Sequence, residues 1–310
     1  MPAFNDSRYD PSAFILIGFP GLEAAHVWLA FPFFLMYLFA LIGNSIILYI
    51  IRTEPSLHEP MYLFLAVLAA LDILLSTSTM PKVLVLLWFG VTEISYNGCL
   101  VQMFLIHSLS AIESTVLLAM AFDRYTAICH PLRHSSILTN PRISWIVLVA
   151  VIRGSLFFTP LPLLIKRLPI CGSRVLSHSY CVHQDVMKLA CADTTPNIVY
   201  GLGAILIVMG VDVLLISVSY VQILRTVSRL SHRECLKAFN TCISHITAVL
   251  IFYTPLIGLS VVHRFGDRSS PTVHIAMGDI YLFLPPVLNP IVYGLLTKQK
   301  QDQWTHGFCR

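Results

Sequence analysis

The sequence predicts an all-α membrane protein, a bundle of seven transmembrane helices followed by a short C-terminal amphipathic helix. Three observations support this fold class. Hydrophobic residues make up 56% of the 310 residues, and charged residues make up only 12%, against roughly 25% in a typical soluble domain. The apolar residues gather in seven runs, each longer than the about 20 residues that a bilayer requires. Arg and Lys are concentrated in alternate segments between these runs.

Each apolar run also contains Gly, Pro, Ser or other polar residues, as transmembrane helices that pack against one another do. The fourth run is unusual because Arg153 and Gly154 lie inside it. No internal repeat is visible in the sequence, which counts against a transporter built from inverted repeats. The predicted helices span residues 26–51, 60–89, 98–128, 143–164, 197–227, 236–262 and 273–296.

The third predicted helix, residues 98–128, organises the rest of the chain. Its apolar sequence is interrupted by His107, Glu113 and Asp123, and Arg124 follows at its cationic end. Isolated ionisable groups are expensive inside a membrane, so each of them is a hypothesis for a functional site.

Charge predicts the orientation of the chain. Residues 1–25 form an N-terminal segment, 26–296 the transmembrane domain, and 297–310 an amphipathic helix and tail. The loops on the side of the C-terminal tail, counted with that tail, carry eleven Lys or Arg against five Asp or Glu, whereas the opposite side carries seven of each. The positive-inside rule therefore predicts a multi-pass plasma-membrane protein with an extracellular N-terminus. The sequon at Asn5 then predicts a glycosylation site.

Four of the eight cysteines fall on the predicted outer side, where disulfides persist: Cys99, Cys171, Cys181 and Cys191. Four cysteines allow three pairings. We favour Cys99–Cys181, which would tie the long outer loop to the start of the third helix, with Cys171–Cys191 closing the loop on itself. The alternative is a metal site formed by His178, Cys181 and His183.

The C-terminal segment, residues 297–310, has Trp304 and Phe308 on one side and lysines near the membrane surface. This pattern predicts a short amphipathic helix that lies on the cytoplasmic face of the membrane in contact with lipid. For Cys309 two interpretations stay open, a palmitoylated cysteine and an exposed thiol.

Several motifs occur in the positions that they occupy in rhodopsin-like G-protein-coupled receptors. Taken with seven spans, the sequence resembles that class through Gly43-Asn44 in the first helix, Leu68-Ala69-Ala70-Leu71-Asp72 in the second, Asp123-Arg124-Tyr125 at the end of the third, and Asn289-Pro290-Ile291-Val292-Tyr293 at the end of the seventh. The resemblance covers almost the whole chain.

Other motifs are more specific and resemble the olfactory receptors: PMYLFL from Pro60, AFDRYTAICHPLR from Ala121 and KAFNTCISH from Lys237. The segments 262–266 and 181–185 are similar to the class I, or fish-like, branch and within it to family 51. The resemblance implies an odorant receptor that activates a stimulatory heterotrimeric G protein.

Asp72 and Glu113 place two carboxylates in the middle of apolar helices, where neither can stay charged alone. Either one of them takes a proton or a cation sits between them. Asn44, Ser110 and Asn289 could then complete an oxygen-lined sodium or water site. The other interpretation is a structural hydrogen-bonded network with no ion. We expect no cofactor other than this sodium ion.

Asp123, Arg124 and Tyr125 lie at the predicted inner membrane edge. Arg124 can pair with Asp123 when the bundle is closed and can reach a partner protein when it opens. The resemblance implies that Tyr220 and Tyr293 approach Arg124 in the open state. We expect G-protein coupling and switching to involve Asp123, Arg124, Tyr125, Tyr220, His245, Tyr253, Asn289, Pro290 and Tyr293.

The sixth predicted helix departs from most rhodopsin-like receptors. Phe252-Tyr253-Thr254-Pro255 stands where Cys-Trp-x-Pro is usual, so Tyr253 is expected to act as the toggle of the core. Cys235 stands where a charged partner of Arg124 is usual, so the resting lock must use other groups. His245 is the candidate for that lock, and the alternative is a residue that only packs.

We expect the ligand in the outer half of the bundle. Arg264 ends the sixth helix, with Ser260 four residues earlier on the same face. A desolvated arginine binds a carboxylate by paired hydrogen bonds, and the resemblance points to small carboxylic acids. Alternatively, Arg264 pairs with Asp267 or Asp185, or extends to solvent. The remaining pocket residues are predicted to be His107, Gln184, Phe158, Leu161, Gly201 and Ile205.

Other classes are disfavoured by particular residues. Ile106 stands where an amine receptor would carry Asp, and Phe283 where an opsin would carry its retinal lysine. No H-E-x-x-H motif occurs, and we expect neither an enzyme nor a nucleic-acid partner. The alternatives to an odorant receptor are a proton- or ion-coupled transporter that uses Asp72 and Glu113, and a lipid or peptide receptor outside the olfactory family.

Overall fold

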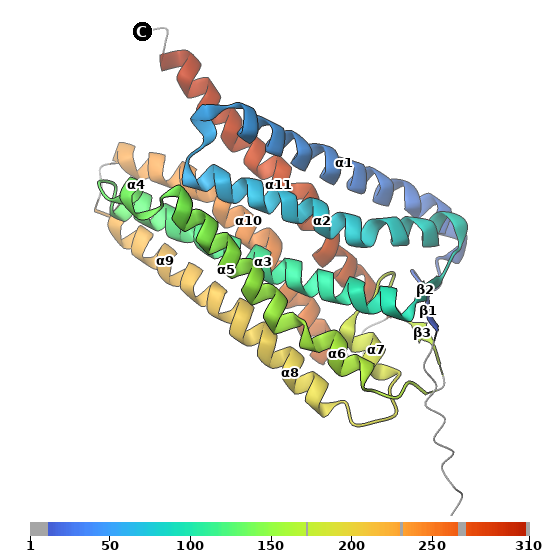
Figure 1. Cartoon of the computed structure of the whole chain (residues 1–310). Helices are drawn as coiled ribbons and strands as arrows, with labels where there is room; N and C mark the ends of the chain where they lie inside the picture. Colours follow the sequence, from blue (N-terminus) through green and yellow to red (C-terminus); the bar gives the residue numbers. More distant parts are fainter. Residues whose placement is uncertain (1–11, 172, 230–231, 266–270, 308–310) are drawn as a thin grey trace, which may run out of the picture.

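The computed structural model in Figure 1 shows long helices that run side by side and form a bundle. The structure describes residues 12–171, 173–229, 232–265 and 271–307. Within them, side chains are not described for residues 232–241, 260–265, 271–274, 276 and 295–307. Asn5 and Cys309 therefore lie outside the described residues.

The first three transmembrane helices follow the predicted runs closely. They are α1 (His26–Thr53), α2 (Pro60–Phe89) and α3 (Tyr96–Cys129). Gly90 ends α2 with a φ of 63°, the left-handed conformation that glycine adopts at helix ends without a Cβ penalty. The Ser95 hydroxyl caps α3 by accepting a hydrogen bond from the N–H of Gly98.

The fourth run forms two helices, α5 (Asn140–Phe158) and α6 (Pro160–Lys166), where the sequence predicted one. The boundary falls before Pro160, because proline has no N–H to donate and favours the first turn of a new helix. The fifth run is also divided, into α8 (Thr195–Ile205), a π-helical turn η3 (Leu206–Gly210) and α9 (Val211–Val227).

The last two helices are α10 (His232–Phe265) and α11 (Pro271–Gly307). α11 runs through residue 297 without interruption, so the C-terminal segment continues the seventh helix instead of forming the separate helix that the sequence predicted. No proline or glycine lies between Leu295 and His306 to end it. The shorter helices are η1 (Glu23–Ala25), η2 (Pro55–Leu57), α4 (His134–Ile137) and α7 (His183–Lys188).

Six segments among the described residues are long and apolar enough to cross a membrane: Glu23–Thr53, Pro60–Phe89, Tyr96–Cys129, Asn140–Lys166, Thr195–Val227 and Cys242–Leu259. With α11 they complete the bundle of seven. Large apolar side chains such as Trp28, Tyr49 and Leu156 are exposed on the outside of the helices. A lipid environment explains this exposure, because a soluble monomer rarely shows such broad apolar surface.

A small three-stranded sheet, which the sequence analysis did not predict, closes one end of the bundle. β1 (Ala13–Leu16) pairs antiparallel with β2 (Glu93–Ser95) and parallel with β3 (Val175–Leu176). Phe14 and Leu16 alternate with exposed residues and are fully buried, as the period of a strand requires. We call this the disulfide end and the opposite end of the bundle the Arg124 end.

Both predicted disulfides are present at the disulfide end. Cys99 at the start of α3 is bonded to Cys181, and Cys171 is bonded to Cys191, with Cα–Cα distances of 5.4 and 5.8 Å. The sulfur of Cys181 is therefore not available as a thiolate, and the alternative of a metal site with His178 and His183 is wrong.

Gly154, the second unusual residue of the fourth run, allows α5 to approach α3 closely. A Cβ at this position would lie 2.7 Å from Cγ1 of Ile112 and 2.9 Å from the backbone oxygen of Ser108. Small residues at helix contacts are typical of membrane bundles, where close backbone approach replaces the hydrophobic effect as the source of packing energy.

Candidate ligand-binding and signalling site

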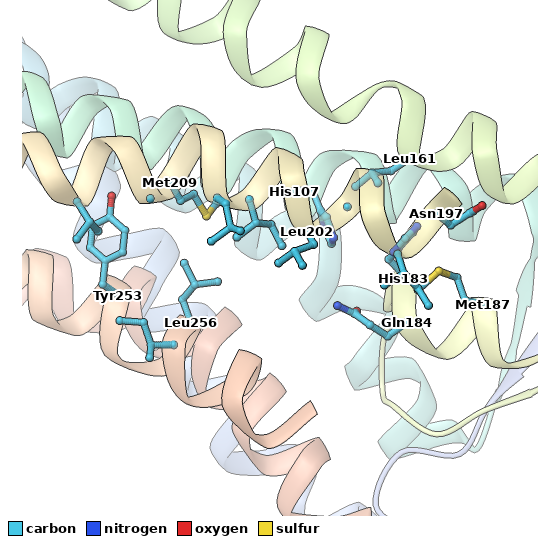
Figure 2. Close-up of a pocket in the computed structure, with 17 residues that line it drawn as sticks. His107, Leu161, His183, Gln184, Met187, Asn197, Leu202, Met209, Tyr253 and Leu256 are labelled. Carbon is cyan, nitrogen blue, oxygen red and sulfur yellow. The ribbon is translucent and has the colours of Figure 1, made fainter. Parts of the chain in front are cut away.

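A cavity of about 460 Å³ lies between α3, α6, α7 and the α8–η3–α9 segment on one side and α10 on the other (Figure 2). Its volume is in the range of pockets that hold small ligands. Polar groups lie at its end near α7, where His183, Gln184 and Asn197 are found, and apolar side chains such as Leu202, Met209 and Leu256 continue it toward Tyr253.

The structure brings most of the predicted pocket residues together. The cavity is lined by His107, Leu161, Gln184, Gly201 and Ile205. Phe158 lines an adjoining cavity of about 70 Å³ that also contacts His107, Gln184 and Ile205. Ser260 and Arg264 belong to α10, but their side chains lie outside the described residues.

Two polar residues of the cavity, His183 and Asn197, were missed by the sequence analysis. Both are buried, and Nε2 of His183 and Nδ2 of Asn197 have no hydrogen-bond partner among the described residues. Burial, together with the nearby His107, lowers the pKa of His183 to about 3, so its imidazole is neutral near pH 7. The sequence feature that could have identified His183 as a cavity residue is its position directly before Gln184, which was predicted to line the pocket.

Beneath the cavity, Tyr253 connects to a network of polar groups. Its hydroxyl lies 2.7 Å from the hydroxyl of Ser114, which donates to Oδ2 of Asp212 at 2.7 Å. Tyr253 thus lines the cavity and is linked through Ser114 to a buried carboxylate. Its role as a toggle stays a prediction.

Arg153, the unexplained cation of the fourth run, is the counter-ion of Asp212. Its guanidinium donates to Oδ1 and Oδ2 of Asp212 at 2.8 and 2.9 Å and to the hydroxyl of Thr115 at 2.8 Å. It also donates to the backbone oxygen of Val208 at 2.7 Å, within the π-helical turn. A π turn disturbs the regular backbone ladder, and the arginine satisfies a carbonyl there. Asp212 belongs to no motif that would identify it as the partner of this cation from sequence.

The mid-membrane carboxylates Asp72 and Glu113 are both buried. Asp72 accepts hydrogen bonds from the side-chain amide of Asn289 at 3.0 and 3.3 Å. These hydrogen bonds join α2 and α11 at the level of the two carboxylates. Asn289 is one of the three groups that were predicted to support Asp72 and Glu113.

The other two supporting groups have other hydrogen-bond partners. The hydroxyl of Ser110 accepts a hydrogen bond from Tyr281 at 2.9 Å. The amide of Asn44 donates to backbone carbonyls of α1 and α11 at 2.9 and 3.0 Å. Ser110 keeps a lone pair for a cation or a water molecule, whereas Asn44 serves to tie α1 to α11.

At the Arg124 end, Asp123 is the centre of a charged cluster. Arg124 lies 3.0 Å from its Oδ2, and Nε2 of His134 lies 2.8 Å from its Oδ1. The guanidinium of Arg124 also contacts the sulfur of Met61 on α2. The hydroxyl of Tyr125 lies 3.2 Å from the ring of His130. Arg124 is thus in the Asp123-paired arrangement expected of a closed bundle.

His245 joins three helices near this end. Its Nε2 lies 3.0 Å from the backbone oxygen of Leu117 on α3, and its Nδ1 lies 2.6 Å from the hydroxyl of Tyr220 on α9. Because a carbonyl only accepts, Nε2 carries the hydrogen, and a neutral ring then accepts from Tyr220. Tyr293 is fully buried. It follows Asn289 and Pro290 in α11, in the last part of this helix whose side chains are described.

Asp185 in the outer loop is paired with residues that are close to it in the sequence. Asp185 is hydrogen-bonded to His178 and lies 3.3 Å from the ammonium of Lys188. Burial acts to raise the pKa of Asp185, but His178 and Lys188 outweigh it and hold the pKa below its usual value. Asp185, one of the two alternative partners of Arg264, is thus already paired within α7 and its preceding loop. The other, Asp267, lies outside the described residues.

A seven-helix bundle with a cavity near one end and an Asp–Arg pair near the other defines a rhodopsin-like seven-helix receptor. A solved structure confirms the fold: the crystal structure of squid rhodopsin matches with a TM-score of 0.69 and 17% identity, covering 87% of this chain and 77% of the rhodopsin chain.

Sequence comparison specifies the family. The olfactory receptor family profile matches residues 33–310. Olfactory receptor 51E2 of Homo sapiens is 67% identical over 95% of this chain and 92% of its own length, and the Mus musculus protein of that name is 66% identical over the same shares. Olfactory receptor 51E1 of Homo sapiens is 58% identical over 95% and 93%. The chain belongs to the olfactory receptor family. It is therefore a G-protein-coupled odorant receptor, a multi-pass plasma-membrane protein and not an enzyme.

Proposed function

We propose that this receptor binds small carboxylic acids in the cavity and activates a stimulatory G protein, with its N-terminus and the disulfide end outside the cell. The cavity itself carries the proposal. It is apolar along most of its length. Apart from Tyr253 at the far end, its polar side chains, His107, His183, Gln184 and Asn197, gather toward the end near α7. Such an arrangement suits a ligand with one polar head and a hydrocarbon tail.

The backbone of α10 supports a role for Arg264. Leu256 and Ile257 line the cavity, and Arg264 lies seven residues after Ile257 in the same helix. Seven residues are two turns, so Arg264 belongs to the same face of α10, about 10 Å nearer the disulfide end. Ser260 lies between them on that face, four residues after Leu256. A guanidinium there would bind a carboxylate by two parallel hydrogen bonds.

The experiment that tests this proposal replaces Arg264 with Ala. The response to butanoic acid, measured as cAMP in cells, should fall at least about a hundredfold in potency, because a charge-assisted pair is worth about 3 kcal/mol or more. Arg264→Lys is the matched control and should retain part of the response, because it keeps the charge without the bidentate geometry. An unchanged response in Arg264→Ala would refute the assignment. Cells that lack the stimulatory Gα subunit should give no cAMP signal.

For the Arg124 end, we propose that ligand binding shifts a closed–open equilibrium. Opening would release Arg124 from Asp123, and with the cations around Arg225 and Arg229 it would receive the G protein. In this scheme His245 is the resting lock, since its bonds to Tyr220 and Leu117 hold α9, α10 and α3 together.

We also propose that Asp72 and Glu113 hold a sodium ion in the resting receptor. Two carboxylates with the hydroxyl of Ser110 offer the oxygen ligands that hard cations prefer. In Glu113→Gln, raising sodium chloride at constant ionic strength should no longer reduce agonist potency, whereas the wild type should lose potency several-fold. Choline chloride controls for ionic strength. The same sodium dependence in both proteins would contradict a sodium site and favour a proton or an ion-free network.

A further inference from the structure

The cavity is elongated along the fifth transmembrane segment. Along the fifth transmembrane segment its lining extends from Asn197 to Val213. These sixteen steps correspond to about 24 Å at 1.5 Å per residue. In Figure 2, His183 and Asn197 lie at one end of the lining and Tyr253 at the other.

Both the length and the volume exceed what a short acid needs. An extended hydrocarbon chain advances about 1.3 Å per carbon, so 24 Å accommodates a chain well beyond about ten carbons. The volume of about 460 Å³ holds about fifteen groups of the size of a water molecule. A four-carbon acid would leave most of this space unfilled.

One wall of the cavity is also part of the lipid-facing surface. Ile198, Leu206 and Ile257 line the cavity, yet they are 50%, 59% and 56% exposed. All three are apolar, and they lie along the edges where α8 and η3 face α10. The cavity therefore opens sideways between the fifth and sixth transmembrane segments, at a level of the bundle where the surroundings are hydrocarbon.

Gly210 lies at this opening and, having no side chain, does not obstruct it. It lines the cavity and is exposed, and a Cβ built on it would meet no described atom within 4 Å. Its helical φ of −65° is one that any residue adopts, so conformation does not demand glycine here. Gly203 lies two turns earlier, in α8, and has the same free space, but it does not line the cavity.

We infer that the cavity is a side-opening tunnel for an amphiphilic acid of medium or long chain. The polar head lies among His183, Gln184 and Asn197, and the hydrocarbon tail runs along the fifth transmembrane segment to the lipid-facing edge at Leu206, Gly210 and Ile257. An acid dissolved in the bilayer reaches the site through this opening. The inference rests on the proposed function and extends it by naming the ligand class and its route.

The test compares butanoic, octanoic and dodecanoic acids on wild type, Gly210→Leu and Gly203→Leu. In the wild type, potency should rise with chain length, by up to about fourfold per buried methylene. Gly210→Leu fills the opening, so it should lower the potency of dodecanoic acid by about tenfold or more while butanoic acid changes by less than about threefold. Gly203→Leu should leave all three potencies unchanged.

Several outcomes would overturn the inference. Butanoic acid acting while dodecanoic acid is weaker in the wild type would contradict the tunnel and leave the proposed function standing. Equal chain-length profiles in Gly210→Leu and wild type, or the same loss in Gly203→Leu, would also contradict it. If no acid activates the wild type, both proposals fail. Cell-surface expression is measured for each variant, and Gly210→Ala, with a smaller shift expected in the same direction, replaces Gly210→Leu if that variant does not reach the surface.

Discussion

Replacing Arg153 with Met is expected to destabilise the folded receptor by about 3–5 kcal/mol, because it leaves the carboxylate of Asp212 buried without its counter-ion. The carboxylate accepts two hydrogen bonds from Arg153 and one from Ser114, and it lies inside the bundle between α5, α9 and α3. Thermal unfolding of the detergent-purified receptor measures the loss, and a smaller cell-surface population should accompany it.

A second replacement tests whether the stability lost in Arg153→Met is caused by the unpaired charge or by the loss of packing. In the double variant Arg153→Met/Asp212→Leu no charge is left unpaired, so about half or more of the lost stability should return. Arg142 of the same helix is the matched control, since its exposed side chain donates to the backbone oxygens of residues 136 and 137 and to no carboxylate in the part of the chain that the structure describes. Arg142→Met should change stability by less than about 1 kcal/mol. A double variant no more stable than Arg153→Met would argue against the ion pair as the cause.

Removing the Cys99–Cys181 disulfide, by replacing both cysteines with Ala, is expected to lower stability and to reduce ligand potency together. The chain-entropy relation gives about 4.5 kcal/mol for its separation of 82 residues. That figure is an upper value, because helices that stay in the bilayer already restrict the unfolded chain. The disulfide also positions the loop that supplies His183 and Gln184 to the cavity, just two and three residues beyond Cys181.

The second disulfide is the matched control. Cys171–Cys191 closes a separation of 20 residues, for which the same relation gives about 3.3 kcal/mol. Replacing both of these cysteines should lower stability less and should leave ligand potency closer to that of the wild type. Thermal unfolding and cAMP titration with the same acid measure both effects. Equal losses of potency in the two double variants would show that Cys99–Cys181 has no special part in shaping the cavity.

Much of the fold was predictable from the sequence because the bilayer restricts the choices. A spanning segment must be apolar and must satisfy its own backbone, so long apolar runs specify helices with little ambiguity. α2 begins and ends at the predicted residues. The breaks at Pro160 and at the π-helical turn were not predicted, and the three short strands depend on pairing between residues far apart in the chain.

The residues of the candidate site were likewise only partly predictable from the sequence. The predicted cavity residues followed from helical position and from the family resemblance, and five of them line the main cavity. His183 and Asn197 were missed because the path of a long loop and the rotation of α8 about its axis decide whether a side chain faces the cavity. Neither is set by a local pattern.

Arg153 is the clearest example of a residue whose presence is evident from the sequence but whose partner is set by the tertiary structure. Seven helices, the family motifs and a cation inside the fourth run can be recognised from the residues alone. That this cation faces Asp212, 59 residues away in the chain, becomes visible when the helices are packed together. In a low-dielectric interior a charge must find a partner, but the helix that supplies it is fixed by packing and not by sequence order.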